Sequence, residues 1–265
     1  MPFAANGEVE LHYESTGAGE APVLLVMGLG MTATGWWRTV PVLAERLRVL
    51  SFDNRGVGRS DRPPGPYTVA QMADDAMTVL DAAGERSAHV YGVSLGGMIA
   101  QEIALRYPAR VRRMVLAATT PGGPRARPPD SATLAFFERR AQMPAEEAVW
   151  ASVPYNYAAR TRLEGAQRIA EDIAQRLRFP IEPDPYRAQL AAAVGHNAYG
   201  RLSAIGAPTL VVHGAEDRML PPDNARLLAD AILGAELRVW PRTGHLLFTD
   251  EPEVDRGVLR FLAPG

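Results

Sequence analysis

A serine stands in the centre of a glycine-flanked motif, Gly92-Val93-Ser94-Leu95-Gly96, between an apolar run and a helical pattern. A strand-to-helix turn tight enough to need glycine at its flanks lifts the central hydroxyl out at the carboxyl edge of a sheet. A hydroxyl in that position can attack an acyl carbon once a base takes its proton. The motif therefore predicts Ser94 as a nucleophile, against the plainer alternative of a glycine-rich connection with a surface serine.

A serine nucleophile needs a histidine as its base and a carboxylate that orients the histidine. In the chain order that accompanies this motif, the acid and then the histidine follow the serine. Asp217 follows the apolar run that ends at His213, and His245 is the single histidine beyond Asp217. The three residues all stand just past predicted strands, which favours Ser94, Asp217 and His245 as a catalytic triad.

The neighbouring carboxylate of Glu216 is the alternative acid. Adjacent residues in a loop point in different directions, and the shorter aspartate is the more usual choice, so Asp217 is favoured. The remaining histidines are expected to be hydrogen-bonded structural residues. They are His12, His89 and His213, in or at the ends of strands, and His196, for which a position at a helix end is favoured over one lining the pocket.

Acyl transfer also needs backbone N–H groups that stabilise the oxyanion of the transition state. The N–H of Leu95, which directly follows the nucleophile, is the first expected donor. The loop Gly28-Leu29-Gly30-Met31 follows an earlier strand, and Leu29 N–H is the second. The alternative for this loop is a plain turn at the end of a strand.

Seven apolar runs predict the strands that must position these residues. They are residues 9–13, 22–27, 49–52, 88–93, 114–117, 209–212 and 237–240. Continuous apolar runs are typical of strands covered on both faces, as in a mostly parallel sheet between helices. The alternation of strand and helix stops at residues 122–205, which read as all helix. We therefore expect a core domain of residues 1–121 and 206–265 and a helical cap of residues 122–205, within which Thr161 and Glu164 predict a capping box at the start of a helix.

Composition excludes several chemistries. The chain has 265 residues, a formal charge of −2, no cysteine and no lysine. Cysteine nucleophiles and thiolate metal sites are thereby excluded, as are pyridoxal Schiff bases and Walker-type phosphate loops. The charge gives no reason to expect nucleic acid or an anionic membrane as partner. No basic residue precedes Arg38, and the longest apolar stretch, residues 21–31, is too short to span a membrane. We therefore expect a cytoplasmic protein.

One further segment, Asp53-Asn54-Arg55-Gly56-Val57-Gly58-Arg59-Ser60-Asp61, resembles the D-x-R-G-x-G-x-S loop of a known superfamily. Together with the serine motif and the ordered acid and histidine, it makes the chain similar over essentially its whole length to the α/β-hydrolases of the serine esterase and lipase type. The resemblance implies an eight-stranded, mostly parallel sheet with a helical cap inserted after the sixth strand. It also implies that no metal or organic cofactor takes part.

Two details qualify this resemblance. The Asp53 loop is expected to be structural, fixed by its glycines and by internal pairing of aspartate with arginine. Met27 stands where many relatives carry histidine before the glycine, so another group must hold the oxyanion loop. The Met-Gly pair at this place also resembles the sequence at the same place in hydrolases of polyketide methyl esters.

The expected substrate is a small to medium apolar ester or lactone, since the cap arginines are expected on a solvated helix face and the apolar cap residues toward the sheet. Met31, Trp36, Trp150 and His196 are candidate substrate-binding residues. Thioesters, carbon–carbon bonds, polyketide methyl esters and perhydrolysis stay open as alternatives on the same triad, and so does the choice between monomer and homodimer.

Two other classes of function fit parts of the sequence. Residues 28–33 fit the dinucleotide-binding pattern G-x-G-x-x-A, with Asp53 some distance on, which would suit an oxidoreductase. Gly35 and Pro41 lie where the helix of that motif should run, which argues against it. A non-catalytic binding protein on the same fold is the second rival, and the complete triad argues against that one.

Overall fold

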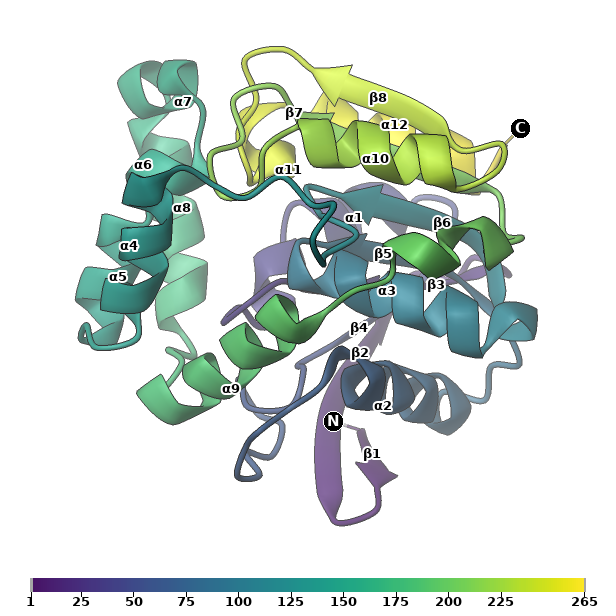
Figure 1. The fold of residues 1–265 in the computed structure, drawn as a ribbon. Helices are drawn as coiled ribbons and strands as arrows, with labels where there is room; N and C mark the ends of the chain where they lie inside the picture. Colours follow the sequence, from purple (N-terminus) through teal and green to yellow (C-terminus); the bar gives the residue numbers. More distant parts are fainter. Residues whose placement is uncertain (1, 265) are drawn as a thin grey trace.

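The computed structural model describes residues 2–264 and is built on an eight-stranded sheet in the order β1-β2-β4-β3-β5-β6-β7-β8 (Figure 1). The strands are β1 (Phe3–Asn6), β2 (Val9–Thr16), β3 (Pro22–Val26), β4 (Arg48–Phe52), β5 (Ala88–Val93), β6 (Val111–Ala117), β7 (Thr209–Gly214) and β8 (Glu236–Trp240). β2 pairs antiparallel with β1 and β4, and the other neighbours pair in parallel. This is the mostly parallel sheet that the apolar runs predicted.

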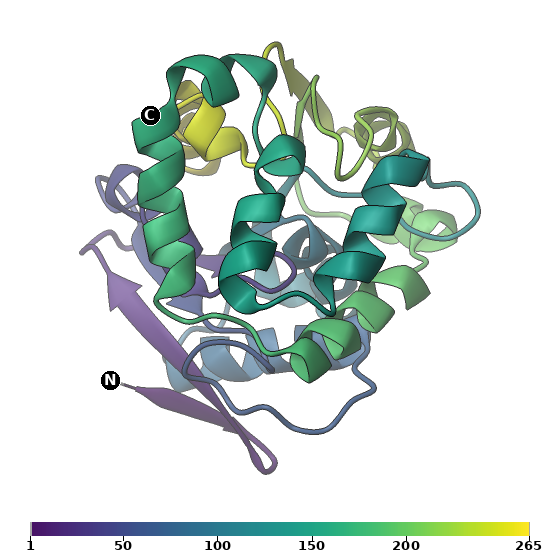
Figure 2. The same ribbon diagram turned by 90° about the vertical axis from the view of Figure 1, so that its left-hand side faces the viewer.

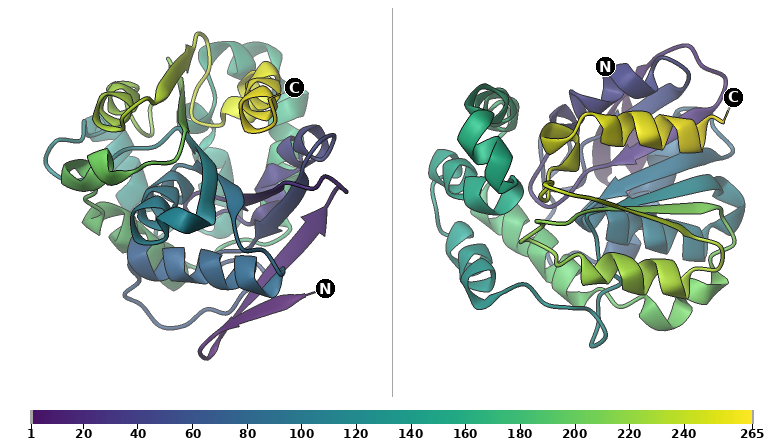
Figure 3. Two further views of the ribbon diagram at one scale, coloured as in Figure 1. Left: turned by 90° about the vertical axis from the view of Figure 1, so that its right-hand side faces the viewer. Right: turned by 90° about the horizontal axis from the view of Figure 1, so that it is seen from above.

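Helices cover both faces of the sheet. The helices of the core are α1 (Thr39–Leu43), α2 (Val69–Ala82), α3 (Leu95–Arg106), α10 (Asp223–Ala231), α11 (Leu247–Asp250) and α12 (Glu253–Leu262). Short 3-10 turns, η1 (Ala33–Trp36) and η2 (Pro108–Arg110), complete the connections. α2, α3 and α10 pack on one face, and α1 and α12 on the other (Figure 3).

Two hydrophobic clusters lie on the two faces of the sheet, and successive side chains of each central strand belong to them in alternation. In β3, Leu24 and Val26 belong to the cluster under α2 and α3, whereas Val23 and Leu25 belong to the one under α12. Because successive side chains of a strand point to opposite faces, a strand buried on both faces must be apolar throughout. The continuous apolar runs of the sequence follow from this geometry.

The order of the strands creates a natural site between β3 and β5. From β3 the chain crosses to β4 on one side, and later to β5 on the other, where Val26 pairs with Gly92. In open α/β sheets, ligands bind outside the carboxyl ends of the strands where the strand order reverses. Two of the expected site segments, the loop after β3 and the turn after β5, therefore emerge side by side.

Residues 122–205, here called the cap segment, lie between β6 and β7 and cover this end of the sheet (Figure 2). Their helices are α4 (Ser131–Arg140), α5 (Ala145–Ala151), α6 (Val153–Asn156), α7 (Ala159–Glu164), α8 (Ala166–Leu177), α9 (Pro183–Gly195) and the 3-10 turn η3 (Tyr199–Ala204). An isolated bridge between Gly122 and Asn197 closes the base of the segment.

Two local predictions differ from the structure. No capping box forms at Thr161, because α7 already begins at Ala159 and a new helix, α8, begins after Gly165. Strand β1 was not predicted by the apolar pattern, since its sequence Phe-Ala-Ala-Asn is short and lies at the edge of the sheet, where only part of a strand is buried.

Candidate active site

Ser94 occupies a strained turn between β5 and α3. Its backbone φ is 57°, in the left-handed region that costs energy for any residue with a Cβ. The turn closes this tightly because Gly96 and Gly97 lack side chains. A Cβ on Gly96 would overlap the carbonyl oxygen of Val26, and one on Gly97 would lie 2.6 Å from Cβ of Thr119. The glycines of the motif thus hold the serine at the carboxyl edge of the sheet.

Asp217 and His245 come together from the loops after β7 and β8. Nδ1 of His245 donates to Oδ2 of Asp217 over 2.8 Å, and the carboxylate is fully buried. Oδ1 of Asp217 accepts from the backbone N–H of Leu220 at 3.0 Å. Burial alone would raise the pKa of Asp217, but the adjacent His245 and His213 hold this pKa well below its usual range. The aspartate is therefore ionised and able to orient the imidazole.

Glu216, the alternative acid, turns the other way. Its Oε2 accepts a hydrogen bond from the N–H of Ala159 at 2.9 Å, and its side chain is exposed. It thereby caps the start of α7 instead of reaching His245. Of the two neighbouring carboxylates, only Asp217 contacts the histidine in the described part of the chain.

The loop after β3 lies directly against the nucleophile. A Cβ on Gly28 would be only 3.0 Å from Cβ of Ser94. Within residues 2–264, the N–H groups of Leu29 and Leu95 donate to no protein acceptor, so both are available to a ligand. Both residues line the same cavity as Ser94, and their role as oxyanion donors stays a prediction.

The loop at Met27-Gly28, where many relatives carry a histidine, is held by a different side chain in this protein. Nδ2 of Asn54 donates to the carbonyl oxygen of Met27 at 3.0 Å, in a fully buried position. On the cap side, Oε1 of Gln189 accepts from the N–H of Gly30 at 2.9 Å. Sequence reasoning missed both residues; Asn54 could have been suspected from its place inside the Asp53 loop, whereas Gln189 gives no signal in the sequence.

The Asp53 loop has the structural role expected of it. Oδ1 of Asp53 accepts from the N–H of Ala33 at 2.7 Å, and Oδ2 pairs with Nε of Arg59 at 3.2 Å. The aspartate thus ties its own loop to the segment that follows the oxyanion loop. The internal pairing of aspartate with arginine is confirmed.

Ser94 and His245 open into one cavity of about 320 Å³ between the core and the cap segment. Leu29, Leu95 and Met31 also line it. The other apolar residues around it are Met27, Val93, Met98, Ala126, Pro128, Pro129, Leu134, Phe137, Leu190, Ala193, Val194, Met219, Leu220 and Leu246. No hydrogen bond joins the Ser94 hydroxyl to the His245 ring within residues 2–264, and such bonds often tighten only around a substrate.

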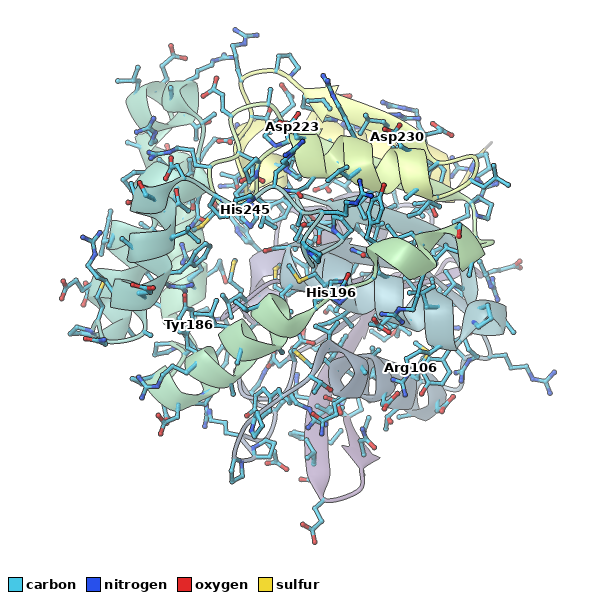
Figure 4. All side chains as sticks on the ribbon, viewed as in Figure 1. Arg106, Tyr186, His196, Asp223, Asp230 and His245 are labelled. Atoms are coloured by element: carbon cyan, nitrogen blue, oxygen red, sulfur yellow. The ribbon has the colours of Figure 1, made fainter. Side chains whose placement is uncertain are left out.

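Three of the four candidate substrate-binding residues lie elsewhere. Trp36 is fully buried in the core, with its ring 4.9 Å from that of Tyr91, because η1 turns it toward the sheet and not toward the cap. Trp150 is 50% exposed on the outer side of α5. His196 is the C-cap residue of α9 (Figure 4), and its Nε2 lies 3.3 Å from Oε1 of Gln101 on α3, outside the lining of the cavity. Among the four, the cavity includes Met31 alone.

The cap arginines also depart from expectation. Most of them are exposed, but Arg140 and Arg176 are each only 8% exposed and both line the cavity. Helical spacing accounts for this, since Arg140 follows buried Phe136 by four residues and Arg176 follows buried Ile173 by three. The expectation that all cap arginines form a solvated face is therefore wrong for these two.

Other candidate sites are not supported by the structure. After β3 the chain forms a loop and the short turn η1, so no α-helix starts within the dinucleotide-like motif. In the part of the chain that the structure describes, no three side chains of the His, Cys, Asp or Glu types are grouped to hold a metal ion. Nor does any described helix combine the length and apolar character needed to cross a bilayer.

Comparison with known proteins agrees with this geometry. Residues 21–252 match the family model of the α/β-hydrolase fold. RutD of Azorhizobium caulinodans, a provisionally assigned carbamate hydrolase, is 33% identical and covers 96% of this chain and 95% of its own length. BpoC of Mycobacterium tuberculosis, provisionally assigned as a non-heme bromoperoxidase, is 32% identical over 96% of this chain and 98% of its own. The structure of the enol-lactonase from Burkholderia xenovorans superimposes with a TM-score of 0.88 at 26% identity, covering 98% and 99% of the two chains. The chain belongs to the α/β-hydrolase family.

Proposed function

We propose that this hydrolase cleaves a carboxylic ester by way of an acyl-enzyme. His245 takes the proton of the Ser94 hydroxyl as the oxygen attacks the ester carbonyl, and the carbonyl oxygen receives hydrogen bonds from Leu29 N–H and Leu95 N–H. The histidine then returns the proton to the leaving alcohol. Water, deprotonated by the same histidine, hydrolyses the acyl-serine and releases the acid. Asp217 orients the imidazole and stabilises its charged form.

A single observation carries the proposal: a serine held at φ 57° and a histidine paired at 2.8 Å with a buried, ionised aspartate open into the same cavity. Strained backbone persists only where the surrounding structure enforces it, and it collects at functional sites. A non-catalytic binding protein would have no need of this turn.

The cavity supports a compact substrate with a largely apolar body. Its walls are mostly aliphatic and aromatic, and a volume of about 320 Å³ is at the small end for ligand sites. A lactone presents the same carbonyl to the serine, and the likeness to an enol-lactonase favours lactones as a second substrate class. Thioesters, carbon–carbon bonds, polyketide methyl esters and perhydrolysis use the same groups and stay alternatives within the proposal. A cytoplasmic location also stays a prediction.

The test combines labelling with a substrate panel. An organophosphonate should attach to Ser94, and Ser94→Ala should lower kcat for para-nitrophenyl esters by several orders of magnitude. Ser152→Ala is the matched control for labelling, because Ser152 lines the same cavity but lies on the cap. Attachment of the phosphonate to Ser152, or full activity of Ser94→Ala, would refute the proposal.

A further inference from the structure

The residues that line the cavity beside Ser94 carry positive charge and no negative charge. Arg140 and Arg176 line it from two helices of the cap, α4 and α8, and Arg127 lines its exposed rim. No aspartate or glutamate is among the described residues around the cavity. A guanidinium is rarely buried unless an anion accompanies it.

Neither buried arginine forms an ion pair with a carboxylate among residues 2–264. No acidic oxygen lies within 4.0 Å of Arg140 or Arg176 in the described chain. Asp172, one turn before Arg176, makes no direct ion pair with it, although its negative charge raises the pKa of Arg176. Its oxygens accept hydrogen bonds from Trp37, Arg38, Tyr157 and Thr249. Its oxygens are thereby used outside the cavity.

Arg176 is held rigidly by neutral groups. Its Nη1 donates to Oγ of Ser152 at 2.9 Å, and Nδ2 of Asn156 donates to the same hydroxyl at 2.9 Å. The carbonyl of Asn156 accepts from the N–H of Leu246, next to the triad histidine. Burial, followed by the charge of Arg140, lowers the pKa of Arg176 to about 10, so the guanidinium stays charged at neutral pH. A cation is thus fixed in place and connected by hydrogen bonds to the His245 loop.

Arg140 is placed beside the oxyanion loop. Its guanidinium carbon lies 4.6 Å above the ring of Tyr186, and its Nη2 would be 3.3 Å from a Cβ on Gly30. Its buried Nε has no hydrogen-bond partner among the described residues. A stacked guanidinium with an unused buried donor is prepared to bind a planar anion.

We propose that Arg140 and Arg176 bind a carboxylate of the substrate, while the scissile carbonyl of the same molecule faces Ser94. This inference rests on the proposed function and narrows its substrate class to esters or lactones that carry one anionic end on an apolar body. The two guanidinium groups repel each other, and a carboxylate between them would relieve that repulsion while satisfying their donors.

Glu182 is an acidic side chain that could compete with a bound anion. It lines a small neighbouring cavity together with both arginines, but its side chain is exposed and makes no ion pair within the described residues. If Glu182 were the true partner, Glu182→Gln would change the affinity for anionic substrates as strongly as loss of an arginine. We expect a weaker effect, or a modest gain in affinity because one competing charge is removed.

The test uses two esters that differ only at the far end. One is the para-nitrophenyl half-ester of adipic acid; in its neutral counterpart an isopropyl group, of similar shape, replaces the carboxylate. We expect the wild type to favour the half-ester by about tenfold to a hundredfold in kcat/KM, the range of a hydrogen bond to a charged group. Arg140→Met and Arg176→Met should each bring this ratio close to one.

Arg139→Met and Arg178→Met are the matched controls, because they remove exposed arginines from α4 and from the C-cap position of α8. Both should keep the wild-type ratio. Since a charge-removing variant could fail to fold, binding is also measured on the wild type alone. Adipate should bind by calorimetry and compete with ester hydrolysis, whereas its neutral diamide should not.

Failure of the anion site and failure of the proposed function give different results. A wild type that hydrolyses both esters equally well through Ser94, and does not bind adipate, overturns the anion site but leaves the serine hydrolase intact. Hydrolysis that persists in Ser94→Ala overturns the proposed function, and adipate binding still decides the anion site. Preference for the half-ester that survives loss of either arginine also overturns the anion site.

Discussion

Nε2 of His213 lies 3.1 Å from Oδ2 of Asp217, the same oxygen that accepts from His245. The same nitrogen also lies 2.8 Å from the carbonyl oxygen of Leu220. Because both neighbours can only accept, the proton of His213 must be on Nε2. Asp217 therefore has a second buried imidazole N–H beside it, which together with His245 favours its ionised form.

Loss of this second donor should weaken catalysis without abolishing it. We expect His213→Phe to lower kcat by about tenfold, because Asp217 keeps its hydrogen bonds from Leu220 and His245. KM should change little, since His213 does not line the cavity. Steady-state kinetics on a para-nitrophenyl ester gives both constants. A drop in KM and kcat together with a lower melting temperature would indicate a purely structural role.

The acid of the triad can be tested on two neighbouring residues. Asp217→Asn should lower kcat by on the order of 10⁴, because the amide favours the wrong imidazole tautomer. Glu216→Gln is the matched control and should stay near the wild-type rate, since Glu216 contacts the start of α7 and not His245. The reverse result would show that Glu216 is the acid.

Asn54 offers a test of the oxyanion loop that leaves the triad intact. Asn54→Ala removes the hydrogen bond to the Met27 carbonyl and leaves that buried oxygen unpaired, at a cost of about 1–3 kcal/mol in the free energy of unfolding. The loop should then hold Leu29 N–H less firmly, so kcat should fall while phosphonate labelling of Ser94 slows. A variant that loses stability but keeps the full labelling rate would separate Asn54 from the oxyanion site.

The sequence predicted the parts of the fold and site that depend on local pattern. Seven strands match the predicted β-rich runs, and Ser94, Asp217 and His245 each stand past the end of one of these strands. The sequence did not predict the direction of every side chain. Trp36 lies in a loop whose 3-10 turn carries it into the core, and no periodicity shows which way such a turn will face.

Arg140 and Arg176 show a different gap. Their helical spacing to Phe136 and to Ile173 places them on buried faces, so the signal was present in the sequence. It was outweighed by the general preference of arginine for water. A buried charge needs an interaction that compensates for its burial. For these two arginines, the proposed interaction is with a bound ligand.

Two buried histidines away from the triad should make the fold sensitive to acid. Burial, the largest cause in each case, lowers the pKa of His89 and of His196 from 6.5 to about 4. As the pH falls from about 6.5 to about 4, the unfolded chain binds a proton at each histidine and the folded chain does not, so the free energy of unfolding decreases. Asp255 acts in the opposite direction, because burial raises its pKa to about 7 and the folded chain keeps a proton that the unfolded chain releases.

The contribution of a histidine is therefore measured as a difference between variant and wild type. Urea unfolding of His196→Gln near neutral pH and near pH 5 should show a smaller loss of stability than the wild type over the same interval. Equal losses in the two proteins would mean that His196 is protonated in the folded state, with its charge balanced by Glu102 at 3.8 Å.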